Sequence, residues 1–182
     1  MKKIILTLII IGLAFGGYYF LKNSKNTKVS QPTSSENLTF KPDPSNATFS
    51  IDDETITLSQ GKNEKPTSPG SPLLEETILL DKFAYGDLNK DGKNDVALLL
   101  EVSGGGSGTF IYIASFVSGL VNYKGSNAIF VGDRINPKSI SIKNGVVTLN
   151  YLDRKPDEAF AAEPTVLTIK QYIYKNGEFK EI

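Results

Sequence analysis

The chain of 182 residues contains no histidine, no cysteine and no tryptophan. Without histidine and cysteine, the sequence excludes Ser-His-Asp and Cys-His catalysis, the usual zinc ligands, c-type haem attachment and disulfide bonds. It also excludes lipid attachment through a cysteine, as lipoproteins use.

Excess charge of one sign is also missing, since 20 basic and 20 acidic residues give a formal net charge of zero. The charges are unevenly placed, because residues 1–28 hold five lysines and no acidic residue. The remainder therefore carries about five negative charges, and a nucleic-acid-binding surface needs the opposite sign. We expect no nucleic-acid partner.

An apolar run from Ile4 to Leu21 follows Lys2 and Lys3. It has the length of a short membrane span and exceeds the 7 to 15 residues typical of a signal-peptide core. No clear small-x-small cleavage site follows it. Residues 1–22 are therefore predicted to be an N-terminal signal anchor that places a single-pass transmembrane helix in the cell membrane, with a cleaved secretory signal as the alternative. A three-residue N-terminal tail normally stays cytoplasmic, so the body is expected to be extracytoplasmic.

Residues 23–44 are rich in Asn, Ser, Thr, Lys and Pro and have little to bury. This composition predicts a flexible polar linker. From residue 45 the pattern is that of β-strands, so residues 45–182 are predicted to be an extracytoplasmic β domain. Its class is all-β, with antiparallel hairpins or a meander sheet arranged as a sandwich or an open barrel.

Several hairpins can be placed from turn residues. Asn144-Gly145 and Asn176-Gly177, each between strand-like segments, are the strongest short-range hairpin signals in the chain. A further hairpin is predicted around Asp52-Asp53, and a short strand at Leu120 to Tyr123. Gly61 to Pro72 is rich in Gly, Pro and polar residues, which predicts a break between strands.

One further strand is predicted to lie in the interior. Val96 to Val102 is a continuous apolar run of strand length. This pattern is typical of a strand buried on both faces.

The acidic segment before that strand carries the most specific chemistry in the chain. Calcium takes six to eight oxygen ligands, which a loop supplies at alternate positions. The candidate ligands at positions one, three, five, seven and nine are Asp87, Asn89, Asp91, the carbonyl oxygen of Lys93, and Asp95. Gly92 permits the sharp turn between them. Calcium is the cofactor that this spacing predicts.

The segment departs from an EF-hand, because Leu98 stands at position twelve, where a bidentate Glu is required. The flanking residues also predict strands instead of helices. With three carboxylates, the expected affinity is weak, on the order of 10⁻⁴ to 10⁻³ M. The alternative is a polar hairpin in which Asp91-Gly92 makes the turn and the side chains cap backbone groups.

Four motifs occur in order along the chain: Phe83 to Gly92, Gly105 to Tyr112, Gly132 to Arg134, and Arg154 to Glu158. Together they resemble a family of uncharacterised bacterial extracytoplasmic domains, often found in lipoproteins or beside META-type domains. The acidic segment itself resembles the strand-loop-strand calcium loop of FG-GAP repeats. The resemblance implies an extracytoplasmic location, a β architecture and the calcium loop, but no enzymatic activity.

The most economical interpretation is a structural or binding module at the cell envelope, with an envelope protein or glycan as its partner. The alternative is a hydrolase of envelope glycans that uses paired carboxylates as general acid and base. The residues available for that chemistry are Asp153, Asp157, Glu158 and Glu163.

Overall fold

The computed structural model describes residues 40–182, so the predicted anchor and the linker up to residue 39 lie outside the described residues. Within 40–182 every regular element is a strand. No helix that could cross a membrane occurs in this part of the chain. The predicted all-β class is confirmed for the domain.

Twelve strands follow one another in this part of the chain. They are β1 (Thr48–Ile51), β2 (Glu54–Thr57), β3 (Lys62–Pro66), β4 (Leu74–Gly86), β5 (Asp95–Gly104), β6 (Phe110–Ser118), β7 (Tyr123–Gly125), β8 (Ile129–Asp133), β9 (Asn136–Lys143), β10 (Val146–Asp153), β11 (Val166–Lys175) and β12 (Glu178–Glu181).

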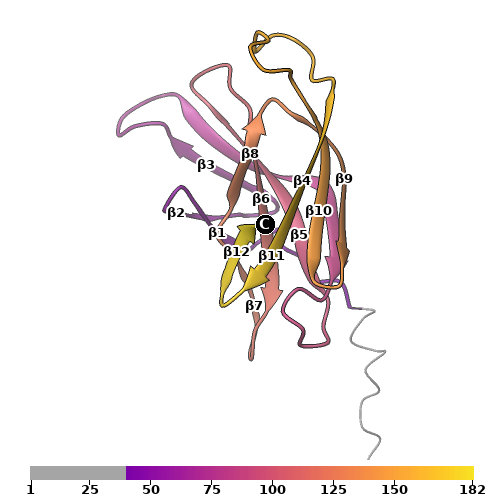
Figure 1. Ribbon diagram of the computed structural model, residues 1–182. Helices are drawn as coiled ribbons and strands as arrows, with labels where there is room; N and C mark the ends of the chain where they lie inside the picture. Colours follow the sequence, from indigo (N-terminus) through magenta and orange to yellow (C-terminus); the bar gives the residue numbers. More distant parts are fainter. Residues whose placement is uncertain (1–39) are drawn as a thin grey trace, which may run out of the picture. The chain divides into compact units, whose positions relative to one another are not determined.

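The strands form three antiparallel sheets (Figure 1). The largest has the order β3-β4-β5-β6-β7, with β8 pairing with β6, and it is curled. A four-stranded sheet has the order β12-β11-β10-β9, and β1 and β2 form a separate hairpin. Most neighbours in the sheets are also neighbours in sequence, which is the hairpin and meander connectivity that the turn residues predict.

Strand β5 is buried on both faces, as the apolar run predicts, and Val96 to Leu100 have no exposed surface. Ala97 and Leu99 pack into one hydrophobic core with Val147, Leu149 and other residues of the four-stranded sheet. Val96, Leu98 and Leu100 pack into a second core with residues of the β1-β2 hairpin, including Phe49 and Ile56. The large sheet is therefore the middle layer, because side chains alternate between the two faces of a strand.

The predicted Asn-Gly turns are confirmed. Asn144 and Gly145 have φ values of 53° and 77°, and Asn176 and Gly177 have 56° and 84°. Positive φ at both central residues is the requirement of a type I′ turn, which suits the twist of the flanking strands. The turn at Asp52-Asp53 has the same signs, with φ values of 48° and 67°.

Two expectations about the strands are wrong. The segment Gly61 to Pro72 contains β3, which pairs with β4 despite its polar composition. It is an exposed edge strand, where charged side chains are common. Leu120 to Tyr123 is mostly a turn, and only Tyr123 begins a strand, because Gly119 N–H donates to the Asn122 carbonyl oxygen at 2.9 Å and closes the chain on itself.

Residues 40–44, at the end of the predicted linker, lie against the domain. The ring of Phe40 lies 6.1 Å from that of Tyr123, and the ammonium group of Lys41 lies 5.3 Å from the ring centre of Tyr85. Pro42 and Pro44 are buried. The chain thus enters the domain close to the loop between β4 and β5.

Candidate functional site

The acidic segment forms a compact loop between β4 and β5, whose ends pair through Gly86 and Asp95. At its start, Asp87 Oδ1 accepts hydrogen bonds from Lys90 N at 2.6 Å and from Asp91 N at 3.2 Å. Its other oxygen, Oδ2, accepts from Gly92 N at 2.9 Å. Asp87 therefore organises the turn by accepting from successive backbone amides, as Asx turns do.

The next two ligand positions repeat this arrangement. Asn89 Oδ1 accepts from Asp91 N at 3.0 Å, so it shares that N–H with Asp87 and lies beside it. Asp91 Oδ1 accepts from Lys93 N at 2.9 Å. Gly92 has a φ of 81°, which a residue with a side chain adopts poorly, so glycine is required at the tightest point of the loop.

Asp95, the last predicted ligand, is completely buried. Its Oδ2 accepts from Leu88 N at 2.8 Å and from Asn89 N at 3.3 Å, and its Oδ1 accepts from Ser118 N at 2.8 Å. Three amide donors compensate part of the desolvation of this carboxylate. Asp95 thus joins the start of the loop to the end of β6.

Ser118 is the residue of this site that the sequence does not reveal. Besides its amide, its hydroxyl donates to Asp91 Oδ2 at 2.5 Å, and Asn89 Nδ2 donates to the Ser118 carbonyl oxygen at 2.9 Å. Three of the four predicted side-chain ligands therefore meet one serine more than twenty residues away. No local signal could have found it, because only the pairing of β5 with β6 brings it to the loop.

The loop holds more negative than positive charge. Its acidic residues are Asp87, Asp91 and Asp95. Within residues 40–182, the ion pair recorded for them joins Asp91 Oδ2 to Lys93 Nζ at 3.7 Å. Burial raises the pKa of Asp95 above its ordinary value, and the charge of Asp91 raises it further, against the opposing hydrogen bonds from Ser118 and Leu88. Burial, followed by the charges of Asp95 and Asp91, also raises the pKa of Tyr123.

Asp91 behaves differently. Burial alone would raise its pKa, but the hydroxyl of Ser118 and the amide of Lys93 stabilise the carboxylate, so that its pKa lies below the ordinary value. Asp91 is therefore better prepared than Asp95 to stay ionised. An ionised carboxylate next to a buried one makes a local field that attracts a cation.

All candidate metal-ligand atoms in the loop are oxygen atoms, which suits a hard cation such as calcium. In the described part of the chain, however, no three acidic side chains are gathered as a ready-made metal site. The hydrogen bonds explain this, because the carboxylates are directed at backbone amides and at Ser118. A carboxylate has about four lone-pair sites, so Asp87 and Asp95, which each accept three hydrogen bonds, retain one site each for a cation.

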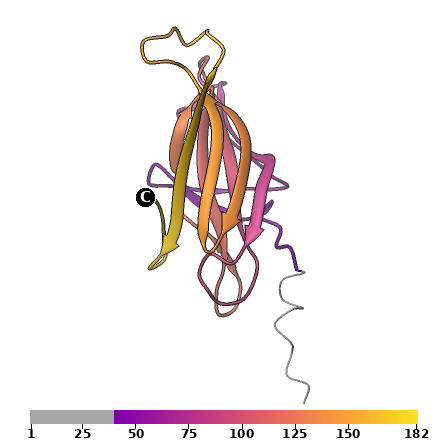
Figure 2. The ribbon, with the colours of Figure 1, turned by 45° about the vertical axis from the view of Figure 1, so that its right-hand side comes forward.

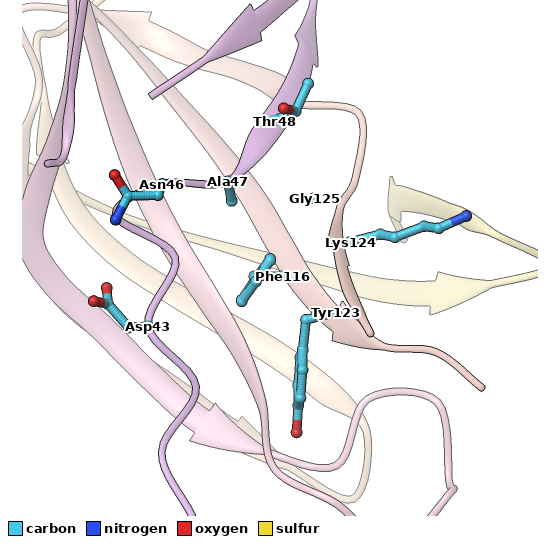
Figure 3. A pocket seen from close by; sticks show the side chains of 8 residues that line it. All are labelled: Asp43, Asn46, Ala47, Thr48, Phe116, Tyr123, Lys124 and Gly125. Carbon is cyan, nitrogen blue, oxygen red and sulfur yellow. The ribbon is translucent and has the colours of Figure 1, made fainter. Parts of the chain in front are cut away.

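A surface pocket of about 500 Å³ lies beside this region (Figure 3). Its lining comes from the start of the domain and from the β6-β7 hairpin: Asp43, Asn46, Ala47, Thr48, Phe116, Tyr123, Lys124 and Gly125. The rings of Phe116 and Tyr123 lie 5.3 Å apart at 31°. An aromatic wall opposite carboxylate and amide groups can both stack on a ligand and hydrogen-bond to it.

The other motifs meet at a second place. Thr109 N donates to Asp133 Oδ1 at 2.9 Å, and Arg134 forms an ion pair with Asp133 at 3.3 Å. Arg154 donates to the carbonyl oxygens of Asp133 and Arg134 at 2.9 and 3.1 Å. These contacts hold three connections together, which is a structural role.

The described contacts of the residues considered for glycan hydrolysis are with neighbouring residues of the same segment. Asp153 Oδ1 accepts from Arg154 N at 2.7 Å. Glu158 Oε2 accepts from Lys155 N at 2.8 Å, and the same two side chains pair at 3.6 Å. These interactions cap a turn, and no described contact pairs two of the four carboxylates.

Comparisons with family models, with curated proteins and with solved structures find no match for this chain.

Proposed function

We propose that this chain is a membrane-anchored extracytoplasmic module whose β4-β5 loop binds calcium, with a structural or binding role at the cell envelope. The observation that carries the proposal is the charge of the loop. Asp87, Asp91 and Asp95 lie within nine residues, and in the described part of the chain the ion pair recorded for them is that of Asp91 with Lys93. A divalent cation would neutralise the excess charge that burial of Asp95 makes costly.

The ligands would be the side chains of Asp87, Asn89, Asp91 and Asp95 and the carbonyl oxygen of Lys93. Calcium would supply no catalytic chemistry here. It would hold together two elements that the loop already connects, namely the start of β5 and the end of β6 at Ser118. The expected gain is in the stability of this end of the domain.

Isothermal titration of the protein with calcium tests this part of the proposal. A single site with a dissociation constant on the order of 10⁻⁴ to 10⁻³ M is expected. Magnesium should bind more weakly, because it requires a tighter octahedron and loses its water reluctantly. Absence of a measurable heat of binding up to ~10 mM calcium would contradict the proposal, provided that the protein is folded.

The location rests on the sequence, and fractionation tests it. Full-length protein in a bacterial host should sediment with membranes, resist carbonate extraction, and be digested by protease added outside the cell. Recovery of a soluble form that begins beyond residue 20 would support the cleaved secretory signal instead. The calcium titration does not depend on which of these two results is obtained.

The partner of the module would be an envelope protein or glycan. The pocket of Figure 3 offers it a stacking surface at Tyr123 and polar groups at Asp43 and Asn46. A hydrolase that acts through Asp153, Asp157, Glu158 and Glu163 is not favoured by any specific contact among residues 40–182.

A further inference from the structure

Leu120 and Val121 form an apolar tip on the hairpin between β6 and β7. Both side chains are completely exposed to water. Single exposed apolar residues are common, but adjacent ones at the apex of a turn form a surface that can be buried elsewhere. Their exposure cannot be relieved by folding back, since the turn is closed by the hydrogen bond from Gly119 to Asn122.

The hairpin that carries the tip is fixed to the acidic loop on both sides. On one side Ser118 N donates to Asp95 Oδ1 at 2.8 Å, and on the other Tyr123 Oη donates to the Asn94 carbonyl oxygen at 2.9 Å. The tip is therefore presented from a supported position. Figures 1 and 2 both show the β6-β7 turn and the β4-β5 loop at the same end of the domain.

The chain enters the domain at this same end. Asn94 Nδ2 donates to the Phe40 carbonyl oxygen at 2.9 Å, and the Phe40 ring packs on Tyr123. Upstream lie residues 22–39 and then the apolar run 4–21. Eighteen residues thus separate Phe40 from the apolar run in the sequence.

Charges of both signs lie near the tip, and its lysines can contact acidic headgroups. Lys90, on the acidic loop, and Lys124, three residues beyond the tip, are both exposed. Lys22, Lys25 and Lys28 precede the domain in the sequence. Lysines near a membrane surface are attracted by acidic headgroups, and the carboxylates of the loop oppose this until a cation neutralises them.

We propose that Leu120 and Val121 insert into the headgroup boundary of the membrane that holds the anchor, so that the acidic-loop end of the domain faces the bilayer. The inference rests on the membrane anchoring proposed above. It goes beyond that proposal, because an anchored domain on a linker of this length could equally stay free in solution. In this proposal, the surface that buries the two side chains is a lipid bilayer.

The chain has no cysteine, so one introduced cysteine can be labelled without background. In the experiment, full-length Val121→Cys carries an environment-sensitive fluorophore and is reconstituted into vesicles of phosphatidylcholine and phosphatidylglycerol. The matched control is Glu163→Cys, because Glu163 is exposed on the loop between β10 and β11, at the opposite end in Figures 1 and 2. The readouts are the emission maximum and quenching by a lipid-borne quencher, with flotation to show anchoring.

The expected result is a blue-shifted emission and strong lipid quenching at position 121, with a water-like emission at position 163. Adding Leu120→Asp should return the label at 121 toward the water-like value, without changing flotation or the melting temperature, because both side chains are exposed. Phosphatidylglycerol should increase the quenching relative to phosphatidylcholine alone.

Other results overturn the inference in recognisable ways. If the protein floats with vesicles but positions 121 and 163 behave alike, the tip does not insert while the anchor holds. A blue shift at 121 without lipid quenching means that the tip is covered by protein, for example a second copy of the chain. If the protein does not float and the label at 121 stays water-like, the anchoring and the insertion both fail.

Discussion

The amide of Ser118 donates a 2.8 Å hydrogen bond to the completely buried carboxylate of Asp95, which joins the last residue of β6 to the first residue of β5. The two strands are neighbours in the large sheet, and the contact brings the acidic loop and the β6-β7 hairpin together. Through Asp95 the loop is thereby attached to the sheet at one end of the domain.

Ser118→Ala should lower the free energy of unfolding by about 1 to 2 kcal/mol, because it removes the hydroxyl that donates to Asp91 but leaves the amide in place. Urea denaturation in a chelator measures the effect. Ser139→Ala is the control, since Ser139 is exposed and accepts one hydrogen bond, from Asn150. Equal effects of the two substitutions would mean that the contact with Asp91 contributes nothing.

Gly177→Val should destabilise the domain by about 1 to 3 kcal/mol through backbone strain, since Gly177 has a φ of 84° and a β-branched residue adopts positive φ poorly. Steric crowding is not the cause, because a Cβ at this position would meet nothing within 4 Å. Gly106→Val has the same open surroundings without positive φ and should change stability little. An unchanged melting temperature for Gly177→Val would refute the type I′ turn.

Tyr172→Phe should stabilise the domain by about 1 kcal/mol. The side chain of Tyr172 is completely buried, and its hydroxyl has no hydrogen-bond partner among residues 40–182, so the hydroxyl is desolvated without compensation. The stacking on Phe179 is retained by phenylalanine. Tyr112→Phe is the contrasting variant and should be destabilising, because its hydroxyl donates to Asp52 at 2.7 Å. A loss of stability in Tyr172→Phe would show that this hydroxyl has a partner in solution.

The all-β class and the hairpins were predictable because most paired strands are neighbours in sequence. The Asn-Gly turns fix which strands pair at 144–145 and 176–177, and the apolar run at 96–102 identifies the central strand. The errors have physical causes too. Strand β3 is a polar edge strand, whose pairing with β4 leaves no apolar pattern, and Leu120-Val121 has strand-like residues in a turn that Gly119 and Asn122 close.

The candidate site was predictable only in part. The spacing of Asp87, Asn89, Asp91 and Asp95 predicts oxygen ligands, but not that each accepts backbone hydrogen bonds. Ser118 and Tyr123 reach the loop through strand pairing, and Phe40 reaches it from a segment whose composition predicts a linker. Such partners depend on tertiary structure and have no signature in sequence spacing.

The calcium-dependent part of the stability should disappear on acidification at a higher pH than an ordinary aspartate would cause, because burial raises the pKa of Asp95. Protonation removes a ligand, so the difference in melting temperature with and without calcium should shrink as pH falls through that raised pKa. Melting curves from pH 8 to 4, in calcium and in chelator, give this difference directly. A difference that stays constant down to pH 4 would show that Asp95 is not a ligand.

In the chelator the two aspartates have opposite effects. The folded-state pKa of Asp95 lies above the unfolded value, so the folded state takes up the proton first and this residue adds stability as pH falls through the folded pKa. The pKa of Asp91 is lowered, so its contribution is present above the unfolded value and is lost as pH falls toward the folded one. Asp91→Ala should remove the second dependence and weaken the first, because the charge of Asp91 contributes to the raised pKa of Asp95.

The most direct test of the central claim is the melting temperature of the protein as a function of calcium. With a dissociation constant near ~10⁻⁴ M, ~1 mM calcium adds roughly 1.4 kcal/mol by mass action. This should raise the melting temperature by about 3 to 5 °C, with a smaller effect from magnesium. Asp91→Ala should abolish the increment. A wild-type melting curve that does not move up to ~10 mM calcium would contradict the claim and leave residues 87–95 as a polar turn.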